Sequence, residues 1–228
     1  MTLKEFDKPT MRAPEQMERV EPTAEQGSAR WLFERAGSVT ASRFEDVIGK
    51  QKNGKYYAAR ENYLWELVIE RLTGNPGDHW TSAATQWGLD NEKPSAMAFE
   101  AATGVILEPC GFVKHPTIPL VGASPDAFIG EDGGYESKSP YNSANHLRTL
   151  LAAEIPAEHI AQCQGGMWIT GRKYWEFQSF DPRFEGVLRR FHQRIERDDA
   201  YITMLAAEVT VFNDEVSARV REIKDKFK

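Results

Sequence analysis

The sequence contains no long hydrophobic run. None of its apolar stretches approaches the roughly 20 residues that a membrane-spanning helix needs. The segment 1–26 is charged and dotted with proline, and it has no apolar core of the kind that a signal peptide carries. We therefore expect a cytoplasmic protein without membrane contact. With 228 residues, 41% of them hydrophobic, the chain is long enough to bury a core.

Cysteine and positive charge are also scarce. The two cysteines, Cys110 and Cys163, have no CxxC spacing, which argues against a disulfide framework or a zinc site and favours buried thiols. The formal net charge of −6 disfavours a plain DNA-binding module, because proteins that coat nucleic acid are normally basic. A nuclease stays compatible, since its acidic metal ligands add negative charge while a local basic lining holds phosphates.

The pattern of apolar residues predicts one domain at 27–228 after an arm at 1–26. Helices are expected at 58–72, 82–102, 142–151, 157–169, 183–205 and from 214 onward, and strands at 105–114, 120–129, 134–139 and 174–180. This order indicates an α/β or α+β fold with a small mixed central sheet flanked by helices. Pro94 predicts a bend or a new helix start within 82–102.

The stretch 121–140 predicts a β-hairpin that carries acidic and basic side chains near one end. Its turn falls at 131–134, where Asp-Gly-Gly supplies positive-φ residues. Glu136 and Lys138 are two positions apart and so point to one face of a strand, which Asp126 could reach from the neighbouring strand. An ordinary hairpin with solvent-facing charges would show the same D…ExK pattern. This pattern alone therefore leaves both an ordinary hairpin and a catalytic site open.

Two carboxylates and a lysine on one face would suit metal-dependent hydrolysis. Mg²⁺ prefers oxygen ligands and needs only one or two carboxylates when phosphate completes its shell, a role that Asp126 and Glu136 fit. Lys138 would then lie beside the metal-bound water, helping to orient or deprotonate it and stabilising charge on the phosphorus. Glu92, on the preceding helix, would add a third carboxylate, although it could equally face solvent.

A second informative segment is the predicted helix at 157–169. Gln162 lies among small apolar residues, where a buried amide would need partners, although an exposed position at the helix edge is as compatible. Gly165 and Gly166 indicate close approach of another backbone or a ligand.

Five short motifs in order resemble the lambda exonuclease family of phage recombination nucleases, also called the YqaJ-type viral recombinases. They span roughly residues 28–183, where the chain continues to Phe180-Asp181-Pro182-Arg183. The motifs are Trp31-x3-Arg35-x-Gly37 with Thr40-Ala41-Ser42; Trp87-Gly88-x3-Glu92; Ser124-Pro125-Asp126; Glu136-x-Lys138-x-Pro140; and Ala161-Gln162-x-Gln164-x2-Met167-Trp168.

This resemblance implies a restriction-endonuclease-like core with PD-(D/E)xK chemistry. By motif, Asp126, Glu136 and the Ser137 carbonyl correspond to metal ligands, Lys138 to the catalytic lysine, and Glu92 to a carboxylate near a second metal. The residues that correspond to a pocket for the 5′-phosphate are Arg35, Ser42, Ser124 and Gln162. His159 stands where relatives usually carry an aromatic residue, and its role and that of Gln164 stay open.

The resemblance further implies a metal-dependent 5′→3′ exonuclease of the alkaline exonuclease type, acting on double-stranded DNA ends, preferably 5′-phosphorylated. It would use Mg²⁺, replaceable by Mn²⁺ and bound as two ions per site, release 5′-mononucleotides and leave a 3′ single strand. A ring-shaped homotrimer, a single-strand annealing protein as partner, and a phage or prophage origin in a bacterial host are expected on the same ground. The alternatives are a PD-(D/E)xK endonuclease or helicase-associated nuclease, and a non-catalytic DNA-end-binding protein.

Overall fold

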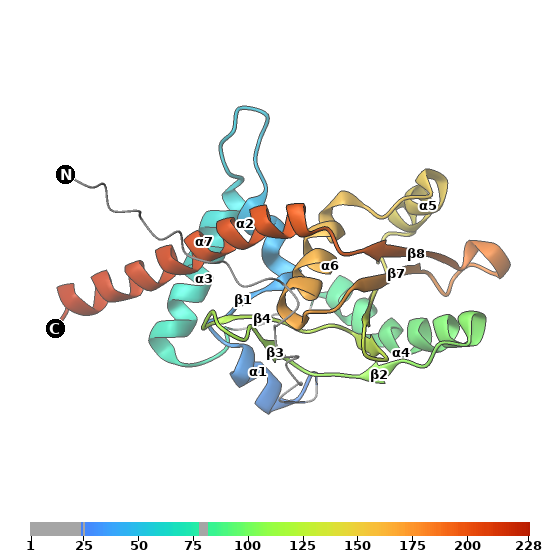
Figure 1. Ribbon diagram of the computed structural model, residues 1–228, viewed down its shortest axis with the longest axis horizontal. Helices are drawn as coiled ribbons and strands as arrows, with labels where there is room; N and C mark the ends of the chain where they lie inside the picture. The colour runs from blue at the N-terminus through green and yellow to red at the C-terminus, as the bar shows by residue number, and fades with distance from the viewer. Residues whose placement is uncertain (1–23, 25, 78–81) are drawn as a thin grey trace, which may run out of the picture.

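A computed structural model describes residues 24, 26–77 and 82–228 (Figure 1). Its centre is a five-stranded mixed sheet of order β2-β5-β6-β7-β8, in which only β6 and β7 run parallel. The strands are β2 (Glu108–Pro109), β5 (Ala127–Ile129), β6 (Gly133–Lys138), β7 (Tyr174–Phe180) and β8 (Arg190–Glu196). The predicted mixed sheet is therefore confirmed. Nearly all of the expected arm at 1–26 lies outside the described residues, and the domain limits stay a prediction.

A second, three-stranded sheet lies beside the first. It has the order β1-β4-β3 and contains β1 (Val39–Thr40), β3 (Val113–Lys114) and β4 (Val121–Ala123). Each of the predicted strands at 105–114 and 120–129 is thus split, and its two parts belong to different sheets. Pro125 marks the second break, because a proline has no N–H to donate to a ladder. Asp126 follows at once, directly before β5.

The hairpin of β5 and β6 is present, but its glycines act differently from the prediction. The turn is made by residues 130–132, and the positive φ belongs to Gly130, at 50°. Gly133 and Gly134 lie within β6, so the expectation that they shape the turn is wrong. A Cβ atom on either one would come within 2.4 Å of the Tyr174 or Trp175 ring on β7. The glycines therefore allow aromatic side chains to lie flat on the sheet.

Helices cover the two sheets, and five of the predicted helical segments are confirmed, since the one expected from 214 onward forms the last part of the C-terminal helix. The helices are α1 (Ala29–Arg35), α2 (Phe44–Ile48), α3 (Ala58–Thr73), α4 (Ala83–Thr103), α5 (Ser143–Ala152), α6 (Ala157–Thr170) and α7 (Asp199–Lys226). No new helix begins at Pro94, which lies inside α4. None of the described helices has the length and apolar character needed to cross a membrane.

The predicted helix at 183–205 is wrong. Residues 190–196 form β8, which pairs antiparallel with β7, and α7 begins only at Asp199. The side chain of Asp198 caps α7 by accepting hydrogen bonds from the Ala200 and Tyr201 amides at 3.0 and 2.9 Å. Phe191 and Ile195 are four positions apart, a spacing that fits one helix stripe and also one strand face. Pairing with β7 decides between the two.

The core is organised around α6, whose residues from Cys163 to Thr170 are all buried. A Cβ atom at Gly165 would lie 2.5 Å from the Phe44 ring, and one at Gly166 would lie 2.8 Å from Trp175. The close approach predicted at these glycines is therefore made by aromatic side chains. α7 packs against α2, α3 and α6 and extends beyond the sheets toward the C-terminus (Figure 1).

Candidate active site

The structure brings Asp126, Glu136 and Lys138 together at one end of the β5–β6 hairpin. The Lys138 Nζ lies 2.6 Å from the Glu136 Oε1. The backbone N–H of Ser137 donates a 2.7 Å hydrogen bond to the Asp126 Oδ2. The Glu136 side chain is only 4% exposed, whereas that of Lys138 is 30% exposed. Of Glu136 and Lys138, the lysine is thus the more open to a ligand.

The two carboxylates destabilise each other in their charged forms. Desolvation, followed by the charge of Asp126, raises the pKa of Glu136 to about 8. Desolvation also raises the pKa of Asp126. For Lys138 desolvation acts to lower the pKa, but the charges of Glu136 and Asp126 outweigh it and raise that pKa. A cation beside these carboxylates would relieve their repulsion.

Glu92 on α4 faces the same region from across a cavity. Desolvation, together with the charge of Asp126, raises the pKa of Glu92 to about 7, while Lys138 opposes that shift. The cavity has a volume of about 780 Å³ and lies between the start of α4, the end of β6, α5 and the start of α6. Glu92, Lys138 and His159 all line it. Glu92 therefore lines the cavity, in place of the solvent-facing position that the sequence left open.

The donor set fits a hard divalent cation. Within residues 26–77 and 82–228 no three Asp, Glu, His or Cys side chains form a ready-made metal cage. Mg²⁺ does not require one, because it keeps several waters and accepts one or two carboxylates together with phosphate oxygens. Asp126 and Glu136 could supply these carboxylates, and the Ser137 carbonyl is adjacent in sequence to Glu136.

A second cluster forms around Arg35, at the end of α1. The Arg35 Nη2 lies 3.4 Å from the Ser42 Oγ and 3.5 Å from the Thr40 Oγ1. Its guanidinium also lies over the Trp31 ring, 5.0 Å from the centroid. The Trp31 Nε1 in turn donates a 3.0 Å hydrogen bond to the Ser124 Oγ. No carboxylate among the described residues forms an ion pair with Arg35, so the cluster can accept an anion.

Trp31 and Thr40 were not assigned roles from the sequence. Both belong to the first motif of the resemblance, and that membership was the available signal. Their contacts with Arg35 and Ser124 required the fold, because Trp31 and Ser124 are 93 positions apart. Trp31 is thus the link between α1 and the segment that leads into Asp126.

The residues of α6 divide between the two faces of the helix. Gln162 forms a side-chain hydrogen bond with Glu136, and this bond acts to lower the pKa of Glu136. Gln164 is buried and braces the start of α7, because its Nε2 donates to the Glu196 carbonyl at 2.9 Å and its Oε1 accepts from the Asp198 N–H at 3.0 Å. Gln162 therefore lies beside Glu136, whereas the Gln164 side chain bonds to backbone groups of Glu196 and Asp198.

His159 stacks on Phe177 at the wall of the cavity. The ring centroids are 5.3 Å apart. Desolvation, followed by the charge of Lys138, lowers the pKa of His159 to about 3. At neutral pH the imidazole is uncharged, so it offers the cavity a flat, neutral ring.

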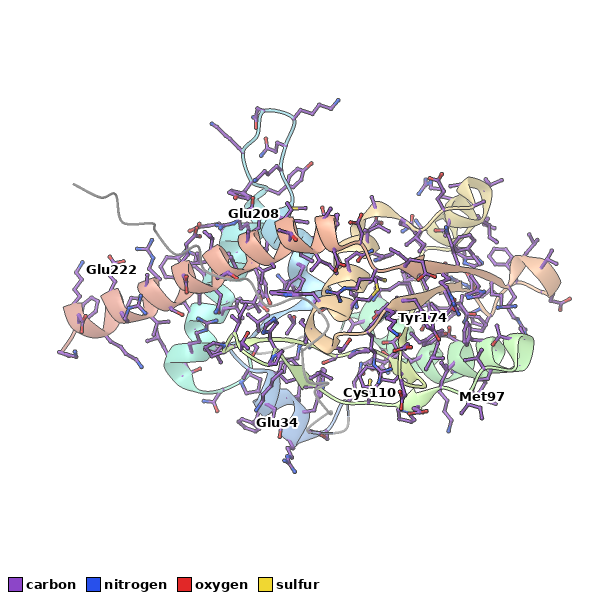
Figure 2. All side chains as sticks on the ribbon, viewed as in Figure 1. Glu34, Met97, Cys110, Tyr174, Glu208 and Glu222 are labelled. Carbon is purple, nitrogen blue, oxygen red and sulfur yellow. The ribbon has the colours of Figure 1, made fainter. Side chains whose placement is uncertain are left out.

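Basic side chains also occur on the loop before α3. Lys50 forms a 2.7 Å ion pair with Glu208, at the base of this loop on α7 (Figure 2). Arg60 likewise forms a 2.8 Å ion pair with Glu215. Of the basic residues in this region, Lys52 and Lys55 are the exposed ones without an ion pair to a described residue.

Residues 30–173 match the family described as the YqaJ-like viral recombinase domain. This match covers more than half of the chain. The chain belongs to the YqaJ-like viral recombinase family. The recognition drawn from the five motifs is thereby confirmed. No curated protein matches the chain.

Solved structures agree with this family. The YqaJ-like chain is similar to LHK-Exo, an alkaline exonuclease from Laribacter hongkongensis, with 38% identity, coverage of 87% of this chain and 97% of that one, and a TM-score of 0.80. LHK-Exo in complex with dAMP gives the same identity and coverage and a TM-score of 0.81. A phage related exonuclease from Haemophilus somnus 129PT, 14% identical over 82% of this chain and 96% of that one, has a TM-score of 0.65 and supports the fold alone.

Proposed function

We propose that this chain is a Mg²⁺-dependent 5′→3′ exonuclease that digests one strand of linear double-stranded DNA. It releases 5′-mononucleotides and leaves a 3′ single strand for recombination by strand annealing. The observation that carries the proposal is the convergence of Asp126, Glu136 and Lys138 in a chain of the viral recombinase family. The similarity to an alkaline exonuclease supports the same activity.

The residues of the trio divide the chemistry between them. Asp126, Glu136 and the Ser137 carbonyl would hold Mg²⁺, for which Mn²⁺ could substitute, and Glu92 would serve a second ion. A metal bound there would lower the pKa of water and offset charge on the phosphate. Lys138 keeps its proton, because the neighbouring carboxylates raise its pKa. It is therefore suited to stabilise the negative charge that develops on the phosphate, rather than to accept a proton.

The Arg35 cluster recognises the end of the digested strand. A guanidinium matches phosphate oxygens with paired hydrogen bonds, and the Ser42 and Ser124 hydroxyls complete the set of donors. Gln162 contacts Glu136, and it would also help to bind the phosphate, so it would serve both parts of the site. We propose that a 5′-phosphate binds at Arg35 while the next phosphodiester reaches Lys138. A relative that binds dAMP supports a nucleotide as the ligand class.

The wider assembly is also part of the proposal. A ring-shaped homotrimer would thread the DNA, and only the lining of its channel need be positive, which is compatible with a net charge of −6. A single-strand annealing protein would receive the exposed 3′ strand. Light scattering on the purified chain tests the trimer, since a monomer or dimer at micromolar concentration contradicts it.

Digestion of linear duplex DNA with Mg²⁺ tests the activity. Asp126→Asn, Glu136→Gln and Lys138→Ala should each lower the rate by at least about a hundredfold, because the first two remove carboxylate charges that would hold Mg²⁺ and the third removes the positive charge beside the reacting phosphate. The control is Lys173→Ala, which removes a lysine that pairs with Asp132 at 3.1 Å at the other end of the hairpin. Its rate should stay close to that of the parent.

Covalently closed circular DNA separates the exonuclease from an endonuclease. An exonuclease needs an end and should leave the circle intact, whereas an endonuclease linearises it. Parent-like digestion by any variant of the trio would contradict the assigned site. A parent that leaves linear DNA intact with Mg²⁺ would favour a non-catalytic end-binding protein.

A further inference from the structure

Arg183, just beyond β7, makes an unusually complete set of contacts near the end of β6. Its Nε and Nη2 donate to both carboxylate oxygens of Asp181, at 2.7 and 2.8 Å. Its Nη1 donates to the Tyr141 carbonyl and its Nη2 to the Pro140 carbonyl, both at 3.0 Å. The Asp181 side chain is fully buried. A planar fork of five N–H groups satisfies these acceptors together, which an ammonium cannot do.

The flat face of the same guanidinium contacts α4. It lies over the Trp87 ring, 4.4 Å from the centroid. The Tyr141 ring meets Trp87 edge-on at 6.3 Å. We name this group, made of Arg183, Asp181, Trp87, Pro140 and Tyr141, the Arg183 clamp. It joins the residues that directly follow Lys138 to the first half of α4.

The first half of α4 needs an anchor of its own. The second half is held to the sheet by Ser95, whose carbonyl and hydroxyl accept hydrogen bonds from the Gln178 Nε2 at 2.9 and 2.8 Å. Pro94 separates the halves and removes one backbone hydrogen bond of the helix. Glu92 lies before Pro94, about one and a half turns after Trp87. Glu92 is five positions after Trp87 and three before Ser95, so its position depends on both anchors.

We infer that Arg183 is a positioning residue, which holds Glu92 at the correct distance from Asp126 and Lys138 across the cavity. It acts through Trp87 on α4 and through the Pro140 and Tyr141 carbonyls on the chain that leaves β6. The inference rests on the proposed function, because Glu92 matters for metal binding only if the site is a nuclease centre. Arg183 itself touches neither Glu92 nor Lys138 in the contacts described above.

Arg183→Lys tests the clamp while keeping the charge. Residues that orient metal ligands typically contribute about 10–100-fold to metal affinity or activity. We expect Mg²⁺ binding in the absence of DNA, measured by isothermal titration calorimetry, to weaken by about tenfold. The Mg²⁺ concentration that gives half of the maximal digestion rate should rise in parallel, whereas the Michaelis constant for DNA ends stays within about twofold of the parent.

Arg194→Lys is the matched control. Arg194 also bonds to a buried carboxylate, through its Nε to the Glu176 Oε1 at 2.7 Å, and it lies 3.9 Å over the Tyr174 ring. The Arg194 and Arg183 side chains are 50% and 40% exposed, so each arginine reaches a buried carboxylate from a similarly exposed position. A general loss of stability would affect both variants alike, whereas loss of positioning would weaken Mg²⁺ binding in Arg183→Lys alone.

Trp87→Leu provides an independent route to the same result. It removes the ring under the guanidinium, so it should weaken Mg²⁺ binding as Arg183→Lys does, and the double variant should show less than the sum of the two effects. Parent-like Mg²⁺ affinity in both single variants, or equal losses in Arg183→Lys and Arg194→Lys, would overturn the inference. Failure of the proposed function is distinguishable, because it shows as a parent that does not digest DNA, whereas the calorimetry needs no digestion.

Discussion

The indole N–H of Trp31 donates a 3.0 Å hydrogen bond to the hydroxyl of Ser124, and this bond connects the two parts of the candidate site. The Trp31 ring lies under the guanidinium of Arg35. Ser124 precedes Asp126 by two positions, at the break between β4 and β5. One tryptophan therefore contacts both Arg35 and the segment that leads into Asp126.

Trp31→Phe should weaken recognition of the strand end without removing it. Phenylalanine keeps a ring under Arg35 but cannot donate to Ser124, and one such hydrogen bond contributes about 1 kcal/mol, or roughly fivefold. We expect the ratio of digestion rates on 5′-phosphate and 5′-hydroxyl ends to fall by about that factor. A ratio equal to that of the parent would contradict a role for this bond.

Arg35→Ala should have a larger effect on the same ratio. Hydrogen bonds to charged groups contribute about 1.5–3 kcal/mol, which corresponds to a loss of tenfold or more in the preference for phosphorylated ends. Arg30→Ala is the control, because Arg30 is on the same helix, is 74% exposed and pairs with Glu34. If both variants keep the preference of the parent, the 5′-phosphate binds elsewhere.

Stability should depend on pH and Mg²⁺ together. The pKa of Glu136 is raised to about 8 from an ordinary value of 4.5, so the folded protein binds more protons than the unfolded chain between these values. The contribution of this group to stability is therefore full below about pH 4.5 and is lost as the pH rises through about 8.

Mg²⁺ needs ionised carboxylates, so it should bind more tightly as the pH rises and should offset this loss. We expect Mg²⁺ to raise the melting temperature more at about pH 8.5 than at about pH 6, measured by differential scanning fluorimetry. Glu136→Gln should remove most of the difference. Equal gains at both pH values in the parent would argue against metal binding at Glu136.

Gln162 and Gln164 offer a matched pair of amides two positions apart. Gln164→Ala leaves the Glu196 carbonyl and the Asp198 N–H without a partner, and it should lower the free energy of unfolding by about 1–3 kcal/mol. Its rate per folded molecule should stay that of the parent. Gln162→Ala should reduce the digestion rate and leave chemical denaturation almost unchanged. The reverse pattern would show that the two faces of α6 have been assigned wrongly.

Much of the candidate site could be predicted from residue types and spacing. Glu136 and Lys138 share a strand face because the side-chain period of a strand is two, whatever surrounds it. The four helices from α3 to α6 were likewise predicted from the local pattern of apolar residues. Local geometry decides these features, so the sequence alone carries them.

Contacts between distant segments could not be read in the same way. Phe191 and Ile195 fit a helix or a strand, and only the hydrogen bonds to β7 make this segment β8. Gln162 and Gln164 look alike in the sequence, yet one reaches Glu136 and the other bonds to the backbone before α7, because the helix directs them to different neighbours.

The candidate site shows the same division between what single residues determine and what packing determines. Spacing was sufficient to identify carboxylates and a lysine suited to phosphate chemistry, and the family resemblance added the arginine, since those properties belong to single side chains. The link from Arg35 through Trp31 to Ser124, the raised pKa values of Glu92 and Glu136, and the Arg183 clamp depend on burial and on distances between α1, α4, β6 and β7. Packing sets these quantities, and packing exists only in the folded chain.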